Sequence, residues 1–136
     1  MSGAVVLDTT VVSLILNRNP LLVLYLLHLQ NATWLISFQT VAEMRFGARK
    51  AGWGASRQQD LERFLQRFQV VPSTDPLATC WAEVKLESQR AGLRLEAGDA
   101  WIAATARLLN APLLTHDRDF SPQSCPSVTV YRYGPS

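Results

Sequence analysis

Residues 4–8 of the chain read AVVLD, a run of four apolar residues that stops at a carboxylate. The run is short, aliphatic and without helical periodicity, which is typical of a strand buried on both faces. Similar runs follow at WLIS (34–37), VV (70–71), LLT (113–115) and VTVY (128–131). Strands that alternate with helical patterns favour a parallel sheet. The sequence therefore predicts an α/β fold with a mainly parallel four- or five-stranded sheet flanked by helices.

Two helices are indicated by the residues at their ends. Thr40 and Glu43 have the spacing of a capping box before MRFGARK, which predicts a helix start at Thr40. Asp75 followed by Pro76 suits the start of a second helix, and Gly92 is suited to end it.

A third helix is predicted from AGDAWIAATARLLN, residues 97–110. Its periodicity places Asp99 on the same stripe as three small or aliphatic residues, Ile102, Ala103 and Ala106. Alanines on that stripe permit close packing against a sheet. Asn110 and Pro112 are expected to stop the helix.

The composition limits the class of protein. With 136 residues and 48% hydrophobic composition, the chain is long enough for one core, so we expect a single domain over residues 1–136. Cys80 and Cys125 lack the spacing of a zinc site or a disulfide framework and are expected to be inert thiols. The first residues lack a leader pattern, and the longest apolar run, 21–27, is too short to span a bilayer. A cytoplasmic protein without a membrane segment is expected.

Four acidic residues occupy positions that a parallel sheet brings to one edge. Asp8 follows the first strand and Asp117 follows the LLT strand, while Glu43 and Asp99 lie near the starts of their helices. In open α/β sheets ligands bind outside the carboxyl ends of the strands. Two like charges about 4 Å apart repel by about 4 kcal/mol at an effective dielectric near 20. Such carboxylates either take up protons or bind a cation, and hard oxygen ligands suit Mg²⁺ or Mn²⁺.

Each acid also has a purely structural interpretation. Asp8 is suited to cap the next helix, Glu43 to be the reciprocal partner of Thr40, and Asp117 to stabilise a turn. Asp99 is suited to interact with a helix dipole. These interpretations explain each residue singly, but they do not explain why four acids share one edge.

The four segments that carry these acids resemble the PIN-domain ribonucleases, and specifically the VapC-like toxins of toxin–antitoxin pairs. The resemblance spans nearly the whole chain. Its motifs are VVLDTTVV with Asp8, TVAEMRFGA with Glu43, DAWIAATA with Asp99 and LLTHDRDF with Asp117. The family often has Asn or Ser at the position of Thr10 and frequently has Asn at that of Asp117.

The resemblance implies a PIN domain and an endoribonuclease that binds one or two divalent cations, Mg²⁺ or Mn²⁺. Asp8, Asp99 and Asp117 would be the principal metal ligands, and Glu43 would complete the shell or orient the attacking water. Asp119 leaves open which carboxylate of the last motif faces the metal, and motif position favours Asp117. The implied partners are an RNA substrate such as tRNA or rRNA, a VapB-like antitoxin and a second copy of the chain.

The remaining charges favour contact with phosphate. Without the four site acids, seven acids face 13 Lys and Arg, a balance of +6. Arg45, Arg49 and Lys50, on the helix of Glu43, and Arg118 are candidates to guide an RNA backbone, although each also suits a solvated surface. His116 is not assigned a catalytic role, because bound metal makes a general base unnecessary.

Two groups of apolar side chains remain. The four tryptophans are expected to be core or interface residues rather than base-stacking groups, with Trp53, between two glycines, the least constrained. The segment PLLVLYLLHLQ, 20–30, is apolar on nearly every side. It is expected either to meet a second copy of the chain or an antitoxin, or to be buried completely in its own core.

Two other functions are consistent with parts of the pattern. The first is a non-catalytic PIN module that acts in a DNA-binding repressor complex with its antitoxin. The second is phosphotransfer through an aspartyl intermediate, which ranks last because DTT lacks the second Asp of DxD and the chain has no phosphate-binding glycine loop. The RNA target and cleavage sequence are not readable from the residues alone.

Overall fold

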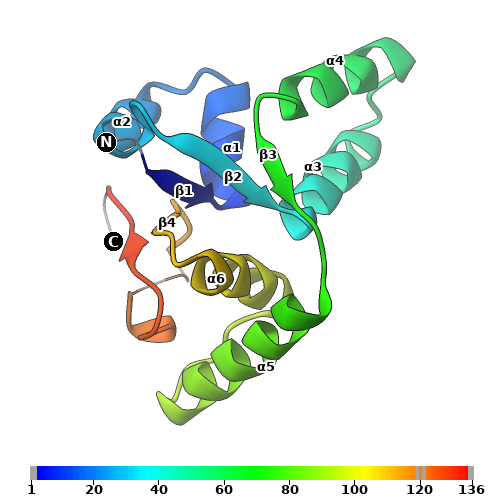
Figure 1. Ribbon diagram of the computed structural model, residues 1–136. Helices are drawn as coiled ribbons and strands as arrows, with labels where there is room; N and C mark the ends of the chain where they lie inside the picture. Colours follow the sequence, from blue (N-terminus) through cyan, green and yellow to red (C-terminus); the bar gives the residue numbers. More distant parts are fainter. Residues whose placement is uncertain (1–2, 119, 121, 135–136) are drawn as a thin grey trace.

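A computed structural model describes residues 3–118, 120 and 122–134. Within these residues five strands form a single sheet in the order β3-β2-β1-β4-β5, and every neighbouring pair is parallel. The predicted α/β fold and parallel sheet are confirmed (Figure 1). Asp119 lies outside the described residues. The strands are β1 (Ala4–Leu7), β2 (Thr33–Ser37), β3 (Gln69–Val71), β4 (Leu113–Leu114) and β5 (Val130–Tyr131).

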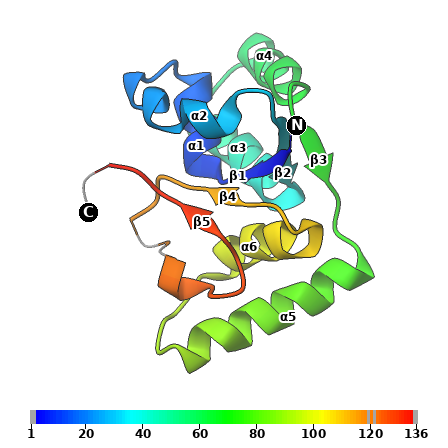
Figure 2. The ribbon, with the colours of Figure 1, turned by 60° about the vertical axis from the view of Figure 1, so that its left-hand side comes forward.

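Helices cover both faces of the sheet (Figures 1 and 2). On one face lie α1 (Thr9–Leu16), the 3-10 helix η1 (Pro20–Tyr25), α2 (Leu26–Leu29), α3 (Phe38–Lys50) and α4 (Ala55–Leu65). On the other lie α5 (Asp75–Arg90), α6 (Ala97–Leu109) and the 3-10 helix η2 (Pro122–Ser124). The protein therefore has three layers, with the sheet between two layers of helices.

The central strand β1 shows why the fold needs both layers. Val5 and Leu7 belong to the apolar cluster beneath α1 to α4, whereas Val6 belongs to the cluster beneath α5 and α6. Side chains of a strand alternate between faces, so an unbroken aliphatic run requires cover on both. The alanines of α6 are buried, which allows this helix to lie close to the sheet: Ala100, Ala103, Ala104 and Ala106.

The predicted start of α3 is wrong. The helix begins at Phe38, and its N-cap is Ser37, whose Oγ accepts a hydrogen bond from the backbone N of Gln39 at 3.0 Å. Thr40 is instead buried inside the first turn. Ser37 is also the last residue of β2, so strand and helix join without a loop. A cap at the end of a strand leaves no separate turn signal in the sequence.

The ends of the other two helices are confirmed. α5 begins at Asp75, with Thr74 as its N-cap, and the chain turns after it at Gly92, whose φ of +76° suits glycine. α6 ends before Asn110, which adopts the left-handed conformation at φ 50°.

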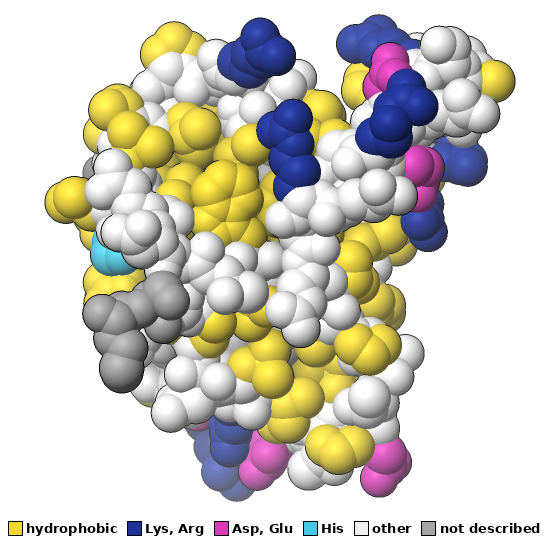
Figure 3. Space-filling view, turned by 45° about the horizontal axis from the view of Figure 1, so that its top comes forward, with side chains coloured by type: hydrophobic (Ala, Val, Ile, Leu, Met, Phe, Trp, Pro, Cys, Tyr) yellow, Lys and Arg dark blue, Asp and Glu magenta, His cyan; other side chains and the backbone are white. Residues whose placement is uncertain are grey.

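The segment at 20–30 is only partly buried, so the expectation of complete burial is wrong. Tyr25 and Leu29 are buried in the core. Five apolar side chains nevertheless remain exposed: Leu21, Val23, Leu24, Leu26 and Leu27. We call these five the η1–α2 apolar surface. Hydrophobic side chains gather on this side of the molecule in Figure 3.

Both cysteines are free, as predicted. Burial raises the pKa of the Cys125 thiol to about 12, which makes its reactive thiolate rare. In the described part of the chain, no helix combines the length and apolarity that crossing a bilayer demands.

Candidate active site

Asp8 lies where β1 gives way to α1, and it is almost completely buried, with 2% of its surface exposed. It occupies the N-cap position of α1, yet its side chain makes no capping hydrogen bond, so the capping interpretation fails. Its Oδ2 accepts hydrogen bonds instead from the hydroxyls of Thr10 and Thr115, both at 2.7 Å. The side chain of Asp8 is therefore held in one orientation from two sides.

Burial raises the pKa of Asp8, although the two threonine hydroxyls favour its charged form and limit the increase. The negative charge of Asp117 raises this pKa further. Asp8 is thus a buried carboxylate whose ionisation is opposed by its surroundings.

Glu43 lies in the second turn of α3 and is half-buried. Its Oε1 accepts from Nε2 of Gln39 at 3.3 Å, and its Oε2 accepts from the hydroxyl of Thr9 at 3.2 Å. The predicted capping role with Thr40 is wrong, because both residues lie inside the helix. Burial raises the pKa of Glu43, and the charges of Asp8 and Asp117 add to the increase.

Asp99 lies in the first turn of α6. Burial raises its pKa to about 7, and the charges of Asp8, Asp117, Glu43 and Glu96 contribute in that order. An acid at a helix N-terminus is normally stabilised in its charged form by the helix dipole. The opposite shift at Asp99 means that burial, together with the neighbouring carboxylates, outweighs the dipole.

The start of α6 packs directly against α3. A Cβ atom added at Gly98 would lie 2.9 Å from Nε2 of Gln39 and 3.6 Å from Oε1 of Glu43. Glycine at this position therefore lets the helix that carries Asp99 approach the helix that carries Glu43.

Asp117 lies just beyond β4 on a loop that is tied to the rest of the site. Its backbone N donates to Oγ1 of Thr115 at 3.1 Å, and the backbone N of His116 donates to Oγ1 of Thr10 at 2.8 Å. The hydroxyl of Tyr25 donates to the carbonyl of Thr115 at 2.8 Å. These bonds connect the Asp117 loop to α1 and to η1.

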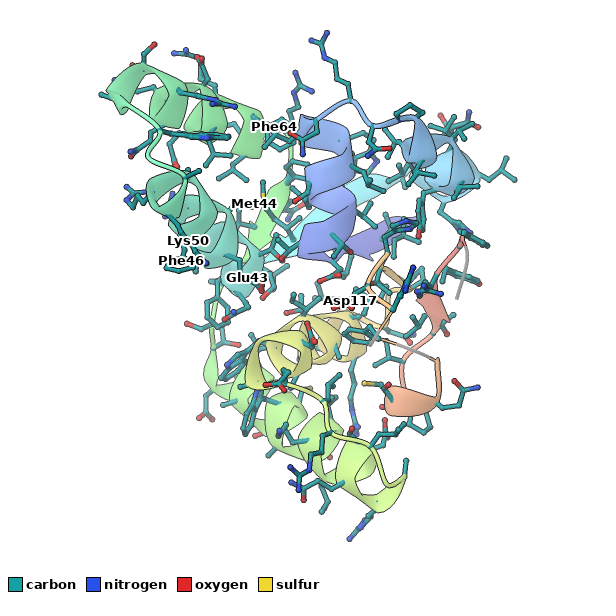
Figure 4. All side chains as sticks on the ribbon, turned by 180° about the vertical axis from the view of Figure 1, so that it is seen from behind. Glu43, Met44, Phe46, Lys50, Phe64 and Asp117 are labelled. Atoms are coloured by element: carbon teal, nitrogen blue, oxygen red, sulfur yellow. The ribbon has the colours of Figure 1, made fainter. Side chains whose placement is uncertain are left out.

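The structure thus brings together all four acids that the sequence singled out. They come from four segments, and each is coupled through its charge to at least one other. Figure 4 shows Glu43 at the start of α3 and Asp117 on the same side of the sheet. Within the described residues, no three His, Cys, Asp or Glu side chains come close enough together to enclose a metal ion. The acids therefore share one edge of the sheet without forming a compact ligand cluster.

The chemistry of the donors fits a hard divalent cation. All four acids provide oxygen, and burial together with neighbouring charges opposes the ionisation of Asp8, Glu43 and Asp99. A cation relieves both the repulsion and the loss of solvation. Mg²⁺ usually keeps several waters and binds through one or two carboxylates, so it does not require all ligands in direct contact beforehand.

Three supporting residues were missed in the sequence, namely Thr115, Thr9 and Gln39. Gln39 has one local signal, because it stands four residues before Glu43 on the same helix face. Thr115 and Thr9 contact acids that are distant in the chain, so no local pattern reveals them.

The basic and aromatic residues have mostly structural partners. Arg45 forms a two-pronged ion pair with Glu62, with its Nη2 2.7 Å from Oε1. Trp34 and Trp81 donate to the carbonyls of Leu29 and Ala97, at 2.9 and 3.2 Å. The guanidinium of Arg57 lies 3.9 Å from the ring centre of Trp53, and Trp101 packs against Trp81.

Comparison with known proteins agrees with this fold. The family model for the PIN domain matches residues 5–122, and the chain belongs to the PIN-domain family. Within that family, its curated relatives include ribonuclease VapC4 of Mycobacterium tuberculosis, which is 31% identical over 99 residues. The matched region is 71% of this chain and 75% of that relative.

Solved structures give the same result. VapBC-5 of Mycobacterium tuberculosis, a member of the VapBC family of toxin–antitoxin systems, superposes with a TM-score of 0.69 at 27% identity, over 96% of this chain and 98% of that one. VapBC2 of Rickettsia felis, bound to a DNA fragment from its promoter, superposes with a TM-score of 0.79 over 98% of this chain and all of that one. At 24% identity, the latter supports the fold alone.

Proposed function

We propose that this chain is an endoribonuclease and the toxin of a VapBC-type toxin–antitoxin pair, and that it uses Mg²⁺ or Mn²⁺ to hydrolyse RNA. The observation that carries the proposal is the shared edge of Asp8, Glu43, Asp99 and Asp117, where burial and neighbouring charges raise the pKa values of Asp8, Glu43 and Asp99. Relatives named ribonuclease VapC support RNA as the substrate. RNA hydrolysis by such a toxin would take place in the cytoplasm.

A bound divalent cation would lower the pKa of water and neutralise charge on the phosphate. Asp8, Asp99 and Asp117 would hold the cation. Asp8 is suited to this role because its Oδ2 is fixed by two hydroxyls. Glu43, whose pKa is raised by burial and by the charges of Asp8 and Asp117, is suited to complete the metal shell or to orient the attacking water. Gln39 and Thr9 orient Glu43 from either side.

The proposed partners are an antitoxin and a second copy of the chain. The solved neighbour VapBC-5, which is 27% identical and belongs to the VapBC family of toxin–antitoxin systems, supports the first partner. The η1–α2 apolar surface supports a protein partner, because exposed apolar side chains that cluster along one segment mark interaction sites.

A non-catalytic role in a repressor complex is the second candidate. The solved structure of FitAB bound to a DNA fragment, at 28% identity, favours it. This role does not account for the acids, however. The raised pKa values of Asp8, Glu43 and Asp99 mean that these carboxylates lower stability at neutral pH, and a module that only binds protein has no need of them.

Cleavage of structured RNA by the purified protein in Mg²⁺ or Mn²⁺ tests the proposal. Asp99→Asn removes one ligand charge with little change in shape, and we expect cleavage at least about 100-fold slower, since even the loss of a supporting residue costs about 10–100-fold at metal sites. The control is Asp60→Asn, because Asp60 is an exposed acid on α4 paired with Arg63. Circular dichroism verifies that both variants fold.

Unchanged cleavage by Asp99→Asn would refute the site assignment. Calorimetry of the free protein separates the two candidate functions. If neither Mg²⁺ nor Mn²⁺ binds, the nuclease proposal fails and the repressor role gains.

A further inference from the structure

One face of α3 continues outward from the four acids Asp8, Glu43, Asp99 and Asp117. We call these four residues the acid cluster. Gln39, Glu43, Phe46 and Lys50 are separated by four, three and four residues, so they lie on a single stripe of the helix. Gln39 and Glu43, at the inner end of the stripe, contact each other and the start of α6. Phe46 and Lys50 lie farther along the same helix (Figure 4).

Phe46 is not needed to hold α3 in place. Its side chain is 65% exposed. The residues of α3 that pack into the core are on a different face: Val41, Met44 and Ala48. A phenylalanine that leaves most of its ring in water contributes little to folding. Its presence beside the acid cluster therefore calls for another explanation.

The surroundings of Phe46 suit a nucleobase better than a protein. The other residues of the stripe, Gln39, Glu43 and Lys50, are all polar or charged. Ala42 and Gly47, which are exposed beside Phe46 on α3, are small. A protein anchor is normally surrounded by further apolar contacts. Here a cation accompanies the ring instead, since Nζ of Lys50 lies 5.9 Å from the ring centre of Phe46.

The placement also solves an electrostatic problem. The acid cluster repels the phosphates of RNA, so binding energy has to come from groups outside the cluster. With a rise of about 1.5 Å per residue, Phe46 lies about 4.5 Å beyond Glu43 along the helix axis and Lys50 about 10.5 Å beyond it. Proteins that bind single strands combine such cations with aromatic rings on which bases stack.

On the basis of the proposed ribonuclease function, we infer that Phe46 is a stacking platform for a base of single-stranded RNA next to the scissile phosphate. Lys50 binds a backbone phosphate of the same segment. Sequence-specific RNA recognition mostly uses unstacked bases of loops and single strands, which aromatic side chains can cover. The stripe on α3 is thus a substrate-binding site continuous with the acids, and it contributes to the choice of cleavage site.

Steady-state cleavage kinetics test this inference. The probe is an oligonucleotide selected by screening a single-stranded RNA library for cleavage by the wild-type protein. Loss of one stacked base weakens binding by about 5- to 150-fold. We expect KM to rise within that range in Phe46→Ala, and to rise in Phe46→Leu, which keeps an apolar side chain but lacks a π face. Phe46→Trp should restore KM to within about twofold, and kcat should change little in all three.

Two further variants complete the design. Leu109→Ala is the control, because Leu109 is exposed at the end of α6 opposite Asp99, and KM should not change. Lys50→Gln should reduce the slope of log KM against log salt by about 1, while Lys50→Arg preserves it.

The inference is overturned if Phe46→Leu has the wild-type KM while the wild-type protein cleaves RNA normally. It is also overturned if Phe46→Ala leaves KM unchanged but abolishes binding of the antitoxin, since Phe46 would then be a protein anchor. Absence of any cleavage by the wild-type protein has a different meaning, because it removes the proposed function itself and the stacking role with it.

Discussion

Burial and the neighbouring acids raise the pKa of Asp99, and its titration gives the first prediction. Its pKa is about 7 in the folded protein, against an ordinary value of 3.8. The folded state therefore binds this proton more tightly than the unfolded state does. Protonation of Asp99 therefore adds to the free energy of unfolding. This contribution is fully present below about pH 4 and is lost as pH rises through about 7. The raised pKa values of Asp8 and Glu43 act in the same direction.

We accordingly expect the metal-free protein to be more stable to urea at pH 5.5 than at pH 8. Asp99→Asn should reduce this difference and stabilise the metal-free protein at pH 8. Saturating Mn²⁺ should reverse the trend in the wild-type protein, because the cation binds the ionised acids. Urea titrations at both pH values measure each effect. An identical pH dependence in the variant and the wild-type protein would show that Asp99 is not the responsible group.

Thr115 is the residue that joins two of the acids. Its hydroxyl donates to Oδ2 of Asp8 and accepts from the backbone N of Asp117. Thr115→Val keeps the shape but removes both bonds. A hydrogen bond to a carboxylate favours its charged form, so its loss should raise the pKa of Asp8 further.

The acid limb of the cleavage profile should therefore move to higher pH in Thr115→Val, and a rate profile between pH 5 and 9 measures the shift. Thr115→Ser, which retains the hydroxyl, is the matched control and should keep the wild-type profile. Equal profiles for the valine and serine variants would contradict a role of this hydroxyl at Asp8.

At the scale of elements, η1 and the residues after β5 together fix the loop that carries Asp117. The buried hydroxyl of Tyr25 lies 2.8 Å from the carbonyl of Thr115 and 2.6 Å from Nδ1 of His116. It also accepts from the backbone N of Tyr133 at 3.1 Å. One hydroxyl thus links three segments that are far apart in the sequence.

Tyr25→Phe should lower the free energy of unfolding by about 1–3 kcal/mol, because buried polar partners lose their hydrogen bonds. It should also lower kcat, since the loop of Asp117 is less restrained. Tyr133→Phe is the matched control, because the hydroxyl of Tyr133 lies 2.5 Å from Nε2 of His28, away from the site. Chemical denaturation and single-turnover cleavage measure the two effects. A larger loss of kcat in Tyr133→Phe than in Tyr25→Phe would contradict this assignment.

At the scale of the whole molecule, the η1–α2 apolar surface is the feature that a lone chain does not explain. Leu27 is 88% exposed and Val23 is 64% exposed, although each lies only two residues from the buried Tyr25. We predict that a second copy of the chain covers this surface through a two-fold interface, in which the same residues meet each other.

The double variant Val23→Asp, Leu27→Asp should convert a dimer into a monomer in sedimentation experiments, because it places charges at the centre of the interface. Leu109→Asp places a charge on another exposed leucine and should leave the dimer intact. A wild-type protein that is monomeric without its antitoxin would contradict the prediction and leave the surface to the antitoxin.

Local patterns in the sequence were sufficient for the main elements of the fold. The run at 4–7 forms β1 with the predicted bounds, because an unbroken aliphatic segment is stable only where both faces are covered. Gly92 and Asn110 mark helix ends because their left-handed backbone is a local property. The start of α3 was misplaced, since Ser37 serves both as the end of β2 and as the cap.

What the sequence by itself determined was the α/β fold class, the run of strands and helices, and the four acids at the ends of these elements. These features depend on periodicity and on residues a few positions apart. Only the tertiary structure decided that β4 lies beside β1, which sets Thr115 against Asp8, and that α6 packs against α3 through Gly98. The exposure of Phe46 and of the η1–α2 apolar surface was decided there as well. Such contacts join residues distant in the chain, and their energies depend on strand order and burial, which no local pattern encodes.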